Sequence, residues 1–230
     1  MNVLLLLFAF AGALLLPGCG SDAPPTQRTR PARAGAPKAA AAPADLAVPS
    51  LDSAALEDVQ QQVLAQLHAD PLVGNVGHDF AHVLAIYQRG ILAGARAELR
   101  AGRDPALLKI AAAVRDRAQQ TSAAADQLAQ RLHGQARNYR PDDLADPFTR
   151  SIRAAVKASF QAHPVAQVPD HDFAALLLAQ RAGAAAIARA ALGTGRLPAP
   201  ARALARQALA GRPAETRLLR AALKHHGSAH

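Results

Sequence analysis

Apolar residues recur at three- and four-residue steps along most of the chain after residue 51, and this spacing predicts helices. Three are expected between residues 51 and 138, from Asp52 or Ser53 to about Leu67, from about Gly77 to about Ala101, and from Asp104-Pro105 to about Leu132. The apolar faces of the second and third comprise Phe80, Leu84, Tyr87, Ile91, Ala95 and Leu99, and Leu107, Ala111, Val114, Ala118, Thr121, Ala125, Leu128 and Leu132.

Residues 139–230 repeat this pattern. The segment Gly77–Ala106 aligns without gaps with Asp170–Ala199, and both contain His-Asp-Phe-Ala, a later Gly, Ala-Arg-Ala-x-Leu and Gly-Arg-x-Pro-Ala. Helices are expected from Asp146-Pro147 to about Ala162, over about 170–192 and from Pro198, with Gly211 and Pro213 kinking or splitting the last one. No strand-like alternation appears, so the sequence predicts an all-α body of two three-helix units, 51–138 and 139–230, in one bundle or two.

The hydrophobic run at the start of the chain has a different character. Val3–Leu16 is uninterrupted by polar residues but falls short of the roughly 20 needed to span a bilayer, which is typical of a signal peptide. Leu16-Pro17-Gly18-Cys19 follows and resembles the lipobox of bacterial lipoproteins. The resemblance implies cleavage after residue 18, diacylglycerol on the Cys19 sulfur and acylation of the new amino terminus. The alternative is an ordinary secretory signal beside an incidental cysteine.

Cysteine usage favours the lipoprotein interpretation, because Cys19 is the only cysteine in the 230 residues and an exported protein gains no internal disulfide from one thiol. Residues 19–50 are rich in Pro and Ala and predict a disordered tether, basic through Arg28, Arg30, Arg33 and Lys38. The tether is either a solvated spacer or a contact for anionic lipid. Gly20, with no Asp in its place, favours the periplasmic face of the outer membrane if the host has two membranes.

The composition and motifs of the chain limit the functions that we expect. The net charge of +9 is dispersed along the helices, aromatic residues make up 3% and Trp is absent, so nucleic-acid binding is not expected. The chain has no G-x-S-x-G, H-E-x-x-H or phosphate-binding motif, and we expect no enzymatic activity.

The segment from Asp79 to Leu132 resembles the ferritin-like domain-of-unknown-function family numbered 305. The resemblance is densest over Glu98–Leu107, and it also rests on Phe80, Gly90, Ala95 and Ala111. The second copy matches through Phe173, Gly183, Leu192, Gly195 and Pro198. It implies an exported, ferritin-like helical bundle, with copper or another transition metal bound by His and Met in some members.

The metal ligands that the resemblance implies are largely absent from this chain. The paired family histidines fall on Tyr87 and Gln88 in the first copy and on Gln180 and Arg181 in the second, and Met1 is the only methionine. The resemblance therefore implies a degenerate metal site.

Two groups of residues remain as candidate sites. His78 and His82 are spaced to reach one metal from a single helix, with Asp79 beside them, and the alternative is a solvated helix N-terminus. Asp170-His171-Asp172 resembles an acid–base pair, but a helix N-cap is the simpler interpretation. Apart from these two, His225, His226 and His230 cluster at the C-terminus, where the tail either binds metal weakly or is a frayed, solvated end.

The sequence is consistent with two functions. The first is a lipid-anchored module, non-enzymatic, that binds or scaffolds an envelope partner; the second is a periplasmic copper- or zinc-binding protein that uses His78 and His82.

Overall fold

A computed structural model describes residues 56–160 and 168–227, with side chains to residue 224. Cys19, the signal peptide, the tether and the side chains of His225, His226 and His230 lie outside the described residues. All regular structure in these ranges is helical, which confirms the all-α prediction. The helices are α1 (Leu56–Ala69), α2 (Val76–Ala101), α3 (Pro105–Leu132), α4 (Pro147–Phe160), α5 (Pro169–Gly193), α6 (Ala199–Leu209) and α7 (Pro213–Gly227).

Local signals set most of these boundaries. Asp104 caps α3 by accepting hydrogen bonds from the amides of Ala106 at 2.7 Å and Leu107 at 3.2 Å. Asp146 accepts in the same way at the start of α4. The break between α6 and α7 confirms the predicted effect of Gly211 and Pro213.

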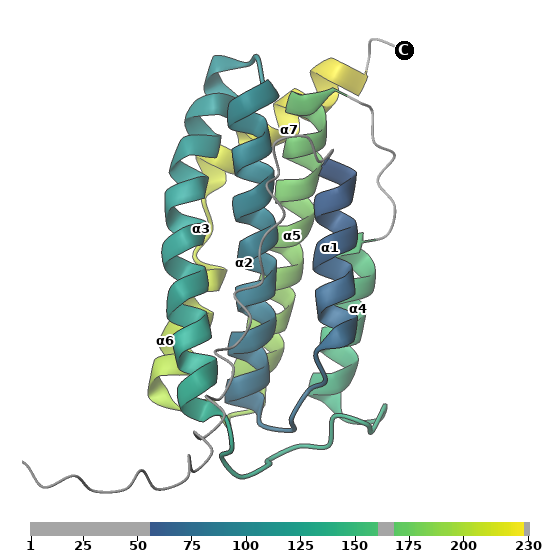
Figure 1. Cartoon of the computed structure of the whole chain (residues 1–230), viewed down its shortest axis with the longest axis vertical. Helices are drawn as coiled ribbons and strands as arrows, with labels where there is room; N and C mark the ends of the chain where they lie inside the picture. The colour runs from purple at the N-terminus through teal and green to yellow at the C-terminus, as the bar shows by residue number, and fades with distance from the viewer. Residues whose placement is uncertain (1–55, 161–167, 228–230) are drawn as a thin grey trace, which may run out of the picture. The chain divides into compact units, whose positions relative to one another are not determined.

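Helices α2 and α5 form the centre of the bundle and pack against each other (Figure 1). They are antiparallel, because Gly94 lies against Leu176 and Gly90, four residues earlier, lies against Gln180. Helix α3 packs along α2, α4 and α6 pack on α5, and α1 contacts both central helices.

Two clusters of buried side chains make up the core, and each combines residues from both halves of the chain. One contains Phe80, Leu84, Phe148 and Ile187, and the other contains Ile91, Leu107, Phe173 and Leu219. The two halves therefore share one core. Since all of these core residues lie between 56 and 222, we expect a chain that begins at residue 46 to fold by itself.

Helix α5 is long and apolar enough to cross a membrane, by length and composition, and is the one such helix among the described residues. Its Phe173, Leu177 and Ile187 are almost completely buried in the two core clusters, as in the central helix of a bundle.

Candidate functional site

The start of α2 contains the histidines that the sequence singled out. Its N-cap is Asn75, whose side chain accepts hydrogen bonds from the amides of Gly77 at 3.0 Å and His78 at 3.1 Å. His78 and Asp79 lie within the first turn and are 8% and 0% exposed. The alternative of a solvated helix N-terminus is therefore wrong for these two residues, although Asn75 does supply the cap.

Asp79 joins three segments of the chain. Its carboxylate accepts hydrogen bonds from the amides of Val73 at 3.0 Å and Gly74 at 2.9 Å, and from the Tyr139 hydroxyl at 2.6 Å. His78 Nδ1 lies 2.8 Å from the same carboxylate and donates to it, since an ionised carboxylate can only accept. Gly74, in the loop before α2, has a φ of +90°, a backbone conformation that glycine adopts readily, and its amide donates to Asp79.

Burial raises the pKa of Asp79, but the hydrogen bonds from His78, Tyr139 and the two loop amides outweigh burial and hold this pKa below its ordinary value. The pKa of Tyr139 is raised, first by burial and then by the neighbouring Asp79. Asp79 is therefore an anion that holds the loop before α2 and the loop after α3 together, and its oxygens are occupied by donors.

Three imidazole rings gather beside this carboxylate. The His78 ring stacks on that of His82, with centroids 5.9 Å apart, and lies 5.4 Å from that of His133. His78 Nε2 is 3.4 Å from His133 Nδ1, and His82 Nε2 is 3.2 Å from a carboxylate oxygen of Asp70.

Burial lowers the pKa of His82, so this ring is neutral at pH 7. Across 56–160 and 168–224, no three His, Cys, Asp or Glu side chains converge as they would around a metal. The structure thus brings His78, Asp79 and His82 together. The atoms that could bind a metal are Nε2 of His78 and the ring nitrogens of His82.

Asp170 has a different role from the one expected. The residue preceding α5 is Val168, which makes no side-chain cap, so the N-cap interpretation of Asp170 is wrong. Its carboxylate instead accepts hydrogen bonds from the amides of Arg103 and Asp104, both at 3.0 Å, in the turn between α2 and α3. His171 Nδ1 lies 3.1 Å from Asp172. The segment joins α5 to the other half of the bundle.

Glu98 lies beneath that same turn. Its side chain is completely buried, and no donor from the described part of the chain reaches either carboxyl oxygen. Burial raises its pKa to about 8, and the hydrogen bond to Asp170 and the charges of Asp170 and Asp104 act in the same direction. At pH 7 Glu98 is therefore largely protonated, and its proton is the one available to bond Asp170. A Cβ at Gly102 would lie 2.5 Å from Glu98 Oε1, so close packing requires this glycine, whereas its φ of −65° suits any residue.

The middle of the bundle holds a second buried polar group. Gln180 is 0% exposed, and neither its amide nitrogen nor its oxygen has a partner within the described chain. Tyr87 donates to Ser159 Oγ at 3.2 Å, and burial raises its pKa to about 12. Tyr87 and Gln180 are two of the four positions, with Gln88 and Arg181, at which the resemblance would place histidines.

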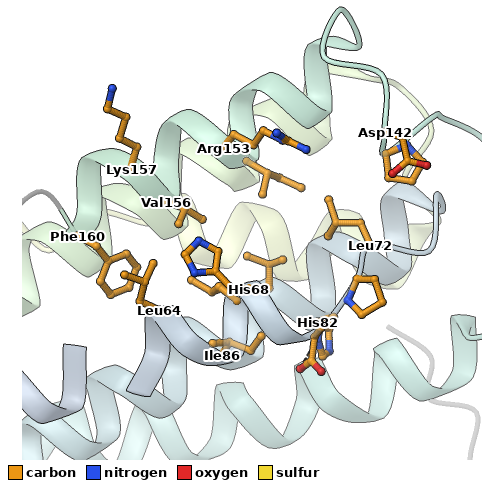
Figure 2. A pocket seen from close by; sticks show the side chains of 16 residues that line it. Leu64, His68, Leu72, His82, Ile86, Asp142, Arg153, Val156, Lys157 and Phe160 are labelled. Atoms are coloured by element: carbon orange, nitrogen blue, oxygen red, sulfur yellow. Dashed lines mark ion pairs between the residues drawn. The ribbon is translucent and has the colours of Figure 1, made fainter. Parts of the chain in front are cut away.

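An apolar groove separates α1 from α4, and its volume is about 670 Å³ (Figure 2). Side chains from α1, α2 and α4 form its floor: Leu64, Leu67, Val83, Ile86, Ile152, Val156 and Phe160. Arg153 and Lys157 of α4, His68 of α1 and the acids Asp70 and Asp142 lie at its edges. A pocket of this size and polarity is typical of sites for small molecules.

Comparisons of the chain with protein-family models, with curated proteins and with solved structures find no match. The class that the structure defines is an all-helical bundle with a buried histidine–aspartate pair at one end of α2 and an apolar groove beside it.

Sequence reasoning missed Tyr139, His133, Glu98 and the groove. Tyr139 and His133 lie in or beside the loop after α3, outside any periodic segment, and no local signal marks them. The groove depends on how far α1 lies from α4, which the pattern of one helix does not determine.

Proposed function

We propose that the protein is a lipid-anchored protein of the cell envelope, acylated on Cys19 and facing the periplasm, whose helical body is a non-enzymatic binding module. The anchor rests on the lipobox-like Leu16–Cys19 segment and the single cysteine. The binding role rests on the groove between α1 and α4, which is an apolar pocket without a convergent set of catalytic side chains. If the host has two membranes, Gly20 favours the outer one.

The acylation has a direct test. Cells that express the chain are labelled with an alkyne analogue of palmitate, and the mature protein is analysed by mass spectrometry. We expect label on the wild type, an amino terminus at residue 19 and no label on the Cys19→Ala variant. Cleavage at another bond, with an unmodified thiol, would overturn the proposed anchor.

The groove is tested by a neutral apolar fluorescent probe added to residues 46–230. We expect saturable binding that Leu67→Trp abolishes, because the larger ring fills the groove floor. The matched control is Leu218→Trp, on the outer side of α7, where the leucine is 46% exposed and binding should persist. Equal probe binding by both variants would show that the groove is not the binding site.

We further propose that the bundle consists of two ferritin-like units derived by duplication. Gly90 of α2 lies against Gln180 of α5, and Gly183 of α5 lies against Tyr87 of α2. In the aligned repeat Gly90 is equivalent to Gly183 and Tyr87 to Gln180, so the same contact occurs twice with the two halves exchanged. Such exchanged contacts are typical of a two-fold arrangement of like units.

A transition-metal protein is the second candidate, because the ring of His78 lies 5.9 Å from that of His82 and 5.4 Å from that of His133. Titration of residues 46–230 with Zn²⁺ or Cu²⁺ by calorimetry tests it. Stoichiometric, micromolar binding that is lost in His78→Ala with His82→Ala, but kept in His68→Ala, would favour this function over the first. Absence of such binding would exclude it.

A further inference from the structure

The groove between α1 and α4 has a distinct distribution of charge. Helix α4 carries Arg150, Arg153 and Lys157 and no acidic residue. Arg153 and Lys157 line the groove and have no ion-pair partner among the described residues, and both are exposed. A cationic edge above an apolar floor is complementary to an amphiphile with a negative head.

Two acids also line the groove, Asp70 and Asp142. Asp70 follows the end of α1, across the groove from α4, and lies 3.2 Å from His82. Asp142 lies in the loop before α4, and Figure 2 shows it at the far end of the groove from Phe160 and Lys157. In the same view the Arg153 side chain extends along the groove toward the end at which Asp142 lies, the Lys157 side chain extends outward from α4, and the His68 ring projects into the groove from α1.

The size of the groove limits what can enter. Its volume of about 670 Å³ lies in the range of sites that hold small molecules. Its walls are helices, whose backbone groups are already paired, so they offer no edge to an extended peptide. A single flexible hydrocarbon chain fits both constraints, whereas a phospholipid would bring two.

We infer that this groove binds one long-chain carboxylate, with the hydrocarbon chain on the apolar floor and the carboxylate at Arg153 and Lys157. The inference rests on the proposed binding function and specifies its ligand. Leu64, Ile86, Val156 and Phe160 contact the chain, and the two cations discriminate in favour of a charged head. Because α4 has no acid, nothing on that helix repels the carboxylate.

The test measures displacement of the neutral apolar probe from residues 46–230 by dodecanoate and by dodecanol, each below its micellar concentration. These ligands have the same chain and differ in the head. We expect dodecanoate to bind up to about fivefold more tightly, since ion pairs with exposed cations contribute in this range. Arg153→Glu with Lys157→Glu should abolish this preference and leave dodecanol binding unchanged.

Arg150→Glu is the matched control, because Arg150 is an exposed arginine of α4 that does not line the groove. We expect it to keep the preference. If the probe binds but the two ligands compete equally, the inferred ligand is wrong while the proposed binding function stands. If the probe does not bind at all, the proposed function itself fails.

Two further outcomes would overturn the inference by identifying another occupant. Cosedimentation with phosphatidylglycerol vesicles, weakened as much by Arg150→Glu as by Arg153→Glu, would show that α4 contacts a lipid surface. Loss of dodecanoate binding in a chain that begins at Gly20 would show that residues 20–45 fill the groove. If residues 20–230 and residues 46–230 both bind dodecanoate, and neither associates with vesicles, the result supports a free carboxylate as the ligand.

Discussion

Glu98 provides the sharpest test of the buried polar structure, through the substitution Glu98→Gln. The glutamine keeps a donor for Asp170 and has nearly the same shape, but it cannot ionise. In the wild type the Glu98 carboxyl is 0% exposed and its pKa is raised, by burial first, to about 8. The unfolded chain ionises near the ordinary value of 4.5.

The direction of the pH effect follows from proton counting. Between pH 4.5 and 8 the folded chain holds a proton on Glu98 that the unfolded chain has released, so unfolding releases a proton and stability falls as pH rises. The slope reaches about 1.4 kcal/mol per pH unit, and the whole window corresponds to at most about 5 kcal/mol. Relaxation around the carboxylate would reduce that figure, and we expect a loss of a few kcal/mol.

The assay is urea unfolding of residues 46–230, followed by circular dichroism at pH 5, 6, 7 and 8, for the wild type and Glu98→Gln. The difference between the two proteins cancels titration of the other groups. We expect near-equal stability at pH 5 and a variant that is progressively more stable toward pH 8. Glu57→Gln, at an exposed acid in the first turn of α1, should show no such trend. A difference that does not change with pH would refute the raised pKa.

Three other substitutions test the remaining contacts by the same unfolding measurement. Gly183→Ala should cost about 2 kcal/mol, because its Cβ would overlap Ser159 Oγ, whereas Gly193→Ala, with open space around the Cβ, should be neutral or slightly stabilising. Asp79→Asn should cost about 3 kcal/mol at pH 7 and less in acid, since the lowered pKa of Asp79 gives stability that is lost as pH falls through the folded-state value. Gln180→Met should stabilise by about 1 kcal/mol, because it removes a buried amide without partners; a loss of stability would mean that the amide is bonded.

The helices could be predicted because their signals are local. The three-four spacing of apolar residues fixes which face is buried, and almost every residue expected on the inner faces of α2 and α3 is buried. The exceptions, Leu99 and Thr121, lie at the margin of the stripe. Asp104 and Asp146 cap as expected, because a cap involves only the next three residues.

The polar contacts could not be predicted, because their partners are far apart in sequence. Asp170 looks like a cap from its position before an apolar run, yet its carboxylate binds the amides of Arg103 and Asp104 across the bundle. Asp79 lies beside His78, as its place in the sequence predicts, but its hydrogen bonds to the loops could not be predicted. Its fourth donor, Tyr139, is 60 residues away in a loop with no periodicity.

The centre of the bundle contains Tyr87 and Gln180, two of the four positions at which the resemblance, if it holds, implies histidines. Each faces a glycine of the opposite central helix. A Cβ at Gly183 would lie 2.7 Å from the Tyr87 ring, so the ring occupies the space beside α5. Its hydroxyl is neutral at pH 7, with a pKa of about 12, and donates to Ser159. A neutral phenol that donates its proton and an amide are poor ligands for copper or zinc, so the histidines at the start of α2 are better candidates for metal ligands than Tyr87 and Gln180.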